Sequence, residues 1–339
     1  MERSLQEKYE RLLAPSLELI EDIRRLEGDI IILGAGGKMG PALAKLAMDA
    51  IHQAGVQKKV TAVARFSEPG LRESLNQLGI ETIICDLLND EELNDLPPAP
   101  NVLYLAGMKF GTTGNESLTW AMNTYLPGRV AEKYKHSRIV AFSTGNVYPL
   151  TPLWMGGAAE DVPASPVGEY AQSCLGRERI FQYASKKNNT PVLLYRLNYA
   201  NDVSYGVLLE IARLVKSGNP IDVKMGNVNV IWQGDANEIA LRCLHHADVP
   251  AKLLNVTGPE ILSVRWIAEE FGKIFGQKPV FNGQEESTAL LSNASESSRL
   301  FGYPKVSIKE MMEMIAEWLA GGGKLINKET HFQEREGKY

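Results

Sequence analysis

Short apolar segments alternate with longer amphipathic segments along the first two thirds of the chain. Each apolar segment is continuous rather than alternating, which is typical of strands buried on both faces of a sheet. The stretches between them, Pro41–Ala54 and Glu169–Lys186 among others, have the length and mixed character of helices. This alternation of strands and helices predicts an α/β fold around a parallel sheet. Since crossovers between parallel strands are right-handed, the general topology of the sheet follows. The predicted strands are Ile30–Leu33, Val60–Ala64, Thr82–Cys85, Val102–Leu105, Ile139–Phe142 and Val192–Leu197.

A helical extension is predicted before the first strand. It breaks at Pro15 and begins again with Ser16 as its N-cap. Its apolar residues cover either the chain's own domain or a partner subunit, and we favour its own domain. The residues that fall roughly on one face are Leu13, Leu17, Ile20 and Ile23.

A glycine-rich turn follows the first predicted strand. Gly34, Gly37 and Gly40 have the spacing G-x-x-G-x-x-G between an apolar strand and a helix. The first glycine permits a tight turn, the second lets a pyrophosphate approach the backbone, and the third lets helix and strand pack closely. A plain strand-to-helix turn also uses glycine, but this context predicts a Rossmann-type dinucleotide site. Its expected cofactor contacts are Gly34, Gly36, Gly37, Lys38, Met39 and Gly40.

The turn fixes the predicted domain organisation. Residues 1–27 form the N-terminal helical extension, and residues 28–200 form a Rossmann domain with a doubly wound parallel sheet. Residues 201–320 are mainly a smaller carboxyl-terminal substrate lobe with segments that return to the sheet. Residues 321–339 open with three glycines, carry mixed charge and are predicted to be a flexible tail.

The end of the second predicted strand bears on the choice of cofactor. An acidic residue there usually binds the adenosine ribose, but this chain has Arg65 and Ser67. A guanidinium pairs well with a 2′-phosphate, so we expect NADP to be preferred over NAD, although an exposed arginine after a strand is the simpler alternative. Asp86 and Leu87, after the third strand, are expected near the adenine, or Asp86 is an ordinary loop aspartate.

Further motifs in the same order resemble the extended short-chain dehydrogenase/reductase family, the NAD(P)-dependent epimerase/dehydratase group, over about residues 29–319. The resemblance implies that Ala106, Gly107, Lys109, Asn123 and Tyr170 contact the cofactor. It also implies Tyr170 as general acid/base, Thr144 as the group that binds the reacting oxygen, and a homodimer formed by helices near 116–133 and 169–186. The motifs are Ala106-Gly107-Met108-Lys109, Asn123, Ser143-Thr144-Gly145-Asn146-Val147-Tyr148, Tyr170 and Leu254-Asn255-Val256-Thr257-Gly258.

One position departs from the family pattern. The family has Tyr-x-x-x-Lys, whereas here Tyr170 is followed by Cys174. Residues four apart share a helix face, and the resemblance implies that the family lysine beside the tyrosine holds the nicotinamide ribose and favours the ionised form of the tyrosine. A neutral cysteine does neither, and an unperturbed tyrosine, with a pKa of ~10, is a poor base near neutrality. Lys109 or Arg177 is a candidate to supply the charge from elsewhere. Cys174 is itself a catalytic candidate or, more simply, a buried inert thiol.

The expected substrate site also departs from the sugar-nucleotide pattern. Gly145-Asn146 replaces the acidic pair of the family's dehydratases, and the segment 226–232 lacks an arginine that often binds a nucleotide diphosphate. A smaller substrate such as a free sugar or sugar acid is therefore expected. The loop Pro149–Val167, rich in Pro and Gly, lies nearby in sequence. Amide and aromatic side chains suit hydroxylated ligands, so such residues in this region are candidates for the substrate pocket. The alternative for each candidate is an ordinary loop or packing residue. The candidates are Ser143, Asn146, Asn198, Tyr199 and Trp232, with Asn201, Asn227 and Asn229.

Composition narrows the class of protein. The net charge of −5 offers no basic surface for nucleic acid, and no apolar run approaches the ~18 residues of a membrane helix. Cys85, Cys174 and Cys243 are far apart and lack metal-ligand spacing, which favours a reducing cytoplasm and predicts no metal site.

The sequence thus predicts an NAD(P)-dependent oxidoreductase or epimerase that acts on a carbohydrate-like hydroxyl compound by hydride transfer. The alternative is a cofactor-binding protein of the same fold with weak or no catalysis, such as a redox sensor or an assembly subunit. Cys174 in place of the family lysine motivates this alternative.

Overall fold

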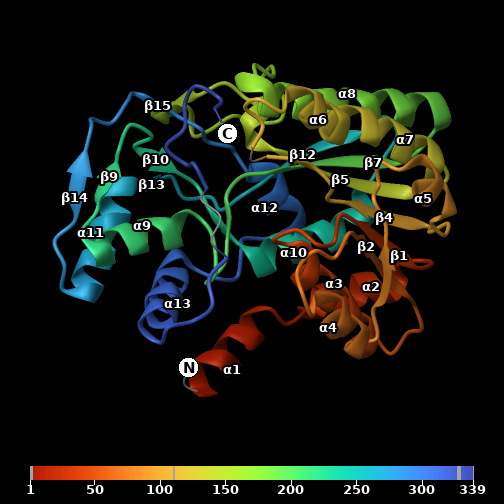
Figure 1. Ribbon diagram of the computed structural model, residues 1–339, viewed down its shortest axis with the longest axis horizontal. Helices are drawn as coiled ribbons and strands as arrows, with labels where there is room; N and C mark the ends of the chain where they lie inside the picture. The colour runs from red at the N-terminus through yellow and green to blue at the C-terminus, as the bar shows by residue number, and fades with distance from the viewer. Residues whose placement is uncertain (1–2, 110, 327–329, 339) are drawn as a thin grey trace.

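The computed structural model describes residues 3–109, 111–326 and 330–338. Its centre is a parallel sheet with the strand order β12-β7-β5-β4-β1-β2-β3 (Figure 1). The chain winds outward in both directions from β1 and β4, which confirms the predicted doubly wound α/β fold. The strands are β1 (Ile30–Leu33), β2 (Val60–Ala64), β3 (Glu81–Ile84), β4 (Asn101–Tyr104), β5 (Arg138–Thr144), β7 (Val192–Leu197) and β12 (Lys252–Val256).

Helices cover both faces of the sheet, which explains the continuous apolarity of the inner strands. In β1, Ile30 and Ile32 face one helical layer, while Ile31 and Leu33 face the other. At the sheet edge, β3 is different, because Ile84 is 57% exposed. The first layer contains α2 (Leu17–Arg25), α3 (Gly40–Ala54), α4 (Leu71–Gln77) and α10 (Gln233–Arg242). The second contains α5 (Asp90–Asp95), α6 (Glu116–Trp120), the π-helical turn η1 (Ala121–Tyr125), α7 (Leu126–Lys133) and α8 (Gly168–Asn188).

A smaller lobe with its own apolar core lies beside the carboxyl edge of the sheet (Figure 1). It is built from α9 (Val207–Ser217), α11 (Val264–Phe275) and α13 (Ile308–Ala320), with β9 (Pro220–Asp222), β10 (Asn227–Val228), β13 (Leu262–Ser263) and β14 (Val280–Asn282). After β9 and β10 the chain returns to the sheet domain through α10, and later through β12 and α12 (Ser295–Phe301).

Short elements join the two parts. The predicted loop Pro149–Val167 contains β6 (Thr151–Pro152), which pairs with β15 (Thr288–Ala289). Likewise β8 (Ala200–Asn201) pairs with β11 (Ile231–Trp232). The short helical turns are η2 (Gly145–Val147), η3 (Leu153–Met155) and η4 (Cys243–His246).

The N-terminal extension forms two helices, α1 (Arg3–Leu12) and α2, with Ser16 as the predicted N-cap of α2. The predicted apolar face is wrong at Leu17, which is 80% exposed, because Leu19 takes the buried position beside Ile20 and Ile23. Helix α2 packs against α3 and α10, and α1 lies against α13 of the lobe. Across the described ranges, every helix falls short of the length or apolarity that a membrane crossing requires.

Candidate active site

The glycine turn has the geometry that its sequence predicts. Gly34 has φ +89°, and a Cβ on it would lie 2.6 Å from the backbone nitrogen of Ala106. A Cβ on Gly40 would lie 2.3 Å from the carbonyl oxygen of Ala35, so the start of α3 closely approaches the end of β1. Both positions therefore require glycine for the fold itself.

Packing within the fold does not require a glycine at position 37, in contrast to Gly34 and Gly40. The nearest atom to a Cβ there is the Gly34 carbonyl oxygen, at 3.7 Å, so the fold leaves room for one. Gly37 nevertheless lines a cavity, and the N-cap residue of α3, Met39, makes no side-chain capping bond. Free space above a glycine, an uncapped helix N-terminus and the adjacent Lys38 together suit the pyrophosphate of a dinucleotide.

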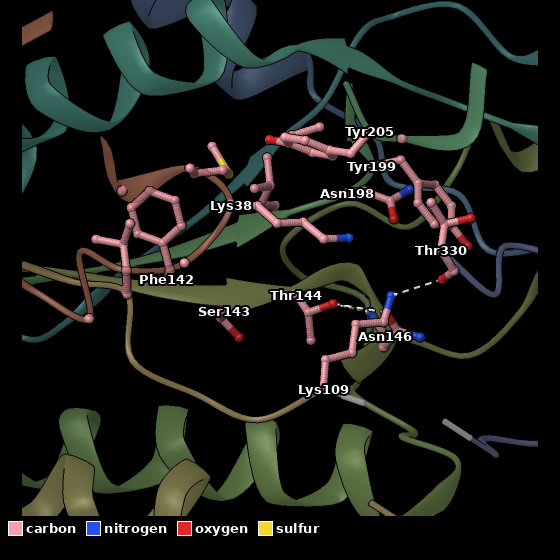
Figure 2. Close-up of a pocket in the computed structure, with 18 of the residues that line it drawn as sticks. Lys38, Lys109, Phe142, Ser143, Thr144, Asn146, Asn198, Tyr199, Tyr205 and Thr330 are labelled. Carbon is pink, nitrogen blue, oxygen red and sulfur yellow. Dashed lines mark hydrogen bonds between the residues drawn. The ribbon is translucent and has the colours of Figure 1, made fainter. Parts of the chain in front are cut away.

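This cavity beside the glycine turn, here called the main cavity because the candidate residues line it, has a volume of about 280 Å³ and opens at the carboxyl ends of β1, β4 and β5 (Figure 2). This is the switch point of the sheet, where ligands bind in doubly wound folds. A larger space of about 370 Å³, between Gly156, Pro259 and Tyr303, shares none of the lining residues of the main cavity. Among the described residues that line the main cavity, none is acidic. They are Gly34, Gly37, Lys38, Met39, Gly40, Leu105, Lys109, Phe142, Ser143, Thr144, Asn146, Tyr170, Leu197, Asn198, Tyr199, Ala200, Tyr205, Gly206, Val207 and Thr330.

Thr144 and Ser143, at the end of β5, have different hydrogen-bond partners. The Thr144 hydroxyl donates to Asn146 Oδ1 at 2.9 Å and accepts from the Asn146 backbone, so both polar side chains sit at the cavity (Figure 2). The Ser143 hydroxyl donates to Glu178 at 2.5 Å, and Glu178 forms a buried ion pair with Arg196. Thr144 is thus positioned for a ligand, whereas Ser143 mainly serves the buried network.

Tyr170 and Cys174 share one face of α8, but only Tyr170 lines the cavity. Cys174 is fully buried in a cluster with Val147 and Tyr148, and burial raises the pKa of its thiol, while a hydrogen bond with Tyr170 partly offsets this shift. A buried thiol with a raised pKa is inert, so the placement of Cys174 among the catalytic candidates is corrected.

Arg177 lies beneath the cavity and anchors the loop that follows β4. It donates to the Phe142 carbonyl and to Asn123 Oδ1, both at 2.7 Å. Asn123 also exchanges two bonds of 2.8 Å with the Met108 backbone. A Cβ on Gly107 would lie 2.5 Å from the guanidinium. Asn123 and Gly107, predicted to contact the cofactor, therefore position the loop, and neither lines the cavity.

The anchored loop carries Lys109 into the cavity. Its Nζ atom lies 5.8 Å from the ring centroid of Tyr170 and 6.0 Å from that of Tyr199. It donates to the Thr330 carbonyl at 3.5 Å (Figure 2). Burial and the nearby charge of Lys38 lower the pKa of Lys109 to about 8, against smaller opposing effects of Cys174 and Glu210. A cation thus lies beside the tyrosine despite the missing family lysine.

The other predicted cofactor residues lie outside the cavity. Arg65 and Ser67 are exposed after the end of β2, next to the glycine turn in the sheet order. Asp86 is exposed and accepts from the Leu88 backbone, while Leu87 is buried. Ala106 is buried against Gly34.

Some of the predicted substrate residues line the cavity and others do not. Asn198 lines the cavity but donates to Asn229 at 2.8 Å, and Tyr199 lines it with φ +44°. Trp232 is a wrong prediction: it is fully buried, and its indole nitrogen donates to the Leu12 carbonyl of the N-terminal extension. The sequence analysis missed Tyr205, whose ring lies 5.2 Å from Lys38 Nζ, and Thr330. Neither residue belongs to a recognisable motif.

Solved structures share this fold at low sequence identity. UDP-glucuronic acid 4-epimerase from Bacillus cereus, in complex with UDP-glucuronic acid and NAD, is 19% identical with a TM-score of 0.71, covering 86% of this chain and 99% of its own. UDP-glucose 4-epimerase from Thermus thermophilus, in complex with NAD, is 18% identical with a TM-score of 0.71 and the same coverage. UDP-glucose 4-epimerase from Thermotoga maritima, with UDP-glucose, is 15% identical with a TM-score of 0.70, covering 87% of this chain and 99% of its own.

Sequence comparison gives the family directly. Among curated proteins, none is significantly similar. The family model described as NAD dependent epimerase/dehydratase matches residues 30–207, which include the glycine turn, Thr144, Tyr170 and Cys174. This match spans more than half of the chain, and the chain therefore belongs to the NAD dependent epimerase/dehydratase family.

Proposed function

We propose that this protein is an NAD(P)-dependent epimerase or oxidoreductase that acts on a hydroxyl group of a carbohydrate-like compound. One observation carries the proposal: Thr144, Tyr170 and Lys109 line the same cavity as the glycine turn. A proton-transfer group, a hydrogen-bonding hydroxyl and a cation thus lie next to a cradle that suits a dinucleotide.

Each side chain has a distinct role in this proposal. Tyr170 takes the proton of the substrate hydroxyl, and the Thr144 hydroxyl exchanges its bond to Asn146 Oδ1 for one donated to the same substrate oxygen. Nicotinamide, when bound, supplies the chemistry of accepting a hydride and, in an epimerase, of returning it. Asn146 orients the Thr144 hydroxyl through their mutual hydrogen bonds.

We assign the charge of the missing family lysine to Lys109. A cation near a phenol favours its ionised form, and the effect strengthens where water is excluded. Lys109 lies 5.8 Å from the Tyr170 ring centroid. Arg177 is the rival, because its buried charge also acts on Tyr170, but its guanidinium is held by Phe142 and Asn123 below the cavity and does not line it. Lys109 is therefore the better candidate to act on Tyr170.

NADP is the proposed cofactor. Support comes from the exposed Arg65 at the end of β2, where no acidic residue is available for ribose hydroxyls. Two of the solved neighbours cited above contain NAD, and titration of this chain with both cofactors decides between NADP and NAD.

The proposed quaternary state is a homodimer, in a reducing cytoplasm that suits the three free thiols. An apolar surface supports the dimer, because large side chains of α6, η1 and α8 are exposed on one layer of the molecule. They are Leu118, Trp120, Tyr125 and Tyr183.

The test is turnover with a panel of sugars, sugar acids and sugar nucleotides, with NADP or NAD, read as reduced nicotinamide and as epimer formation. The proposal expects turnover that Tyr170→Phe abolishes. The matched control is Tyr183→Phe on the same helix, because Tyr183 is 66% exposed. Cofactor binding without turnover of any member would favour the alternative, a cofactor-binding protein without catalysis. The burial of Cys174 already weighs against a redox-sensing thiol.

A further inference from the structure

Residues 330–337, here called the C-terminal strap, begin at the main cavity, which Thr330 lines. The Thr330 backbone and hydroxyl donate to Glu210 at 2.9 and 2.6 Å, and the Thr330 carbonyl accepts from Lys109. Phe332 is 2% exposed and belongs to the apolar core of the lobe, while its carbonyl accepts from the Tyr199 hydroxyl. The sequence predicts a flexible tail for residues 321–339 and gives no indication of these contacts.

The far end of the strap is also held. Arg335 donates to the Thr288 carbonyl and hydroxyl, both at 2.6 Å, and to the Lys224 carbonyl at 3.4 Å. A Cβ on Gly337 would lie 2.3 Å from the Val167 carbonyl oxygen, just before α8. The strap therefore reaches from α9 in the lobe to the start of α8 in the sheet domain (Figure 1).

The strap fills a groove that continues from the cavity. Asn146 lines both the main cavity and a small adjacent space of about 30 Å³. One side of this small space is formed by Tyr148, Leu150, Val167 and Leu290, and the other by Glu334, Arg335 and Gly337 of the strap. A ligand longer than the main cavity would have to displace the strap from this groove.

We propose that the C-terminal strap is a specificity-determining wall of the substrate site, which excludes a nucleoside diphosphate and restricts the substrate to a compact carbohydrate or sugar acid. This proposal deepens the proposed function and rests on it for the identity of the site. The strap lies outside residues 30–207, so the family match does not describe it. Structural neighbours were solved with UDP-sugars, which makes UDP the appropriate probe.

The strap leaves the cavity positively charged, which favours an anionic compact substrate. Lys38 and Lys109 both line it, and none of the described lining residues is acidic. Since Lys38 belongs to the glycine turn, Lys109 is the cation nearest to the strap at Thr330. A carboxylate of a sugar acid would replace the Thr330 carbonyl as its partner more strongly than a neutral sugar would.

The experiment measures UDP binding by calorimetry, with saturating NADP to occupy the glycine turn, to the full chain, to a chain ending at Ile326, and to Gly337→Val. The valine clashes with the Val167 backbone and releases the strap without deleting Phe332, so it covers the case in which truncation prevents folding. The matched control is Lys338→Ala, whose side chain is 73% exposed and forms a surface ion pair with Glu336. Circular dichroism and NADP affinity report whether each variant is folded.

The proposal expects UDP to bind at least about tenfold more tightly to the truncated chain or to Gly337→Val than to wild type and Lys338→Ala. Equal UDP affinity in wild type and the released variants, including no binding to any of them, would overturn it. UDP binding to the cofactor-loaded protein requires no turnover. An inactive protein with strap-dependent UDP binding would therefore refute the proposed catalysis, whereas an active protein with equal UDP affinities would refute the strap alone.

Discussion

The Nζ atom of Lys109 lies 5.8 Å from the ring centroid of Tyr170. These residues come from different elements, one from the loop after β4 and the other from α8. The family places its lysine one turn after the tyrosine, where this chain has the buried Cys174. In this chain the charge of Lys109 therefore comes from outside α8, the helix that carries Tyr170.

Removing the lysine charge should stabilise the cofactor-free protein. The pKa of Lys109 falls from 10.5 to about 8, so between these values the unfolded chain holds the extra proton. The buried charge of Lys109 destabilises the folded state fully below pH about 8, and this destabilisation disappears as pH rises through about 10. Lys109→Met should therefore raise the unfolding free energy near neutral pH, by at most about 3 kcal/mol. Urea denaturation across this range checks it, and a gain that grows with pH would contradict the assignment.

Loss of the Asn123 amide should destabilise the protein without involving the cofactor. Asn123→Ala leaves Arg177 and the Met108 backbone without their partners, which should cost about 2–4 kcal/mol. Chemical denaturation measures this loss, with the exposed Asn94→Ala as control. If the two variants are equally stable, Asn123 does not anchor the loop.

Cofactor preference should depend on Arg65. Arg65→Ala is expected to weaken NADP binding about tenfold while leaving NAD binding nearly unchanged, because only NADP carries the 2′-phosphate. Calorimetric titration of both cofactors decides the question. Equal affinities of the wild-type protein for NADP and NAD would refute the preference.

A charge on the exposed apolar surface should weaken the proposed dimer. Tyr125 is 60% exposed, and Tyr125→Arg would place a charge on the helical layer that also exposes Leu118, Trp120 and Tyr183. The dimer dissociation constant should rise at least about tenfold in analytical ultracentrifugation. Trp154→Arg is the control, since Trp154 is 85% exposed on the separate turn η3. A wild-type monomer would contradict the dimer itself.

The sheet and the glycine turn could be predicted because local sequence determines them. Continuous apolar segments placed β1, β2 and β7 at their observed bounds. The edge strand β3 begins one residue earlier than predicted, since its apolar signal is weak where one side faces solvent. The constraints on Gly34 and Gly40 likewise come from atoms close in the chain or on the next strand.

The rest of the site depends on packing between distant segments. Helix spacing places Tyr170 and Cys174 on one face, but it cannot show that only the first reaches the cavity. Trp232 was expected to be a pocket residue because an aromatic ring at a strand end suits either a pocket or a core. Its core position depends on the N-terminal extension, whose Leu12 accepts its hydrogen bond. Thr330 reaches the cavity through contacts with Glu210 that no local pattern predicts.

The central claim, that Tyr170 acts with the charge of Lys109, is tested most directly by the turnover of Lys109→Met and Lys109→Arg. The matched control is Lys186→Met, at an exposed position on α8. We expect Lys109→Met to lose about a hundredfold or more in kcat and Lys109→Arg to retain most activity. Adding Cys174→Lys to Lys109→Met should restore part of the loss, because it returns a cation to the family position. Full activity of Lys109→Met would contradict the account.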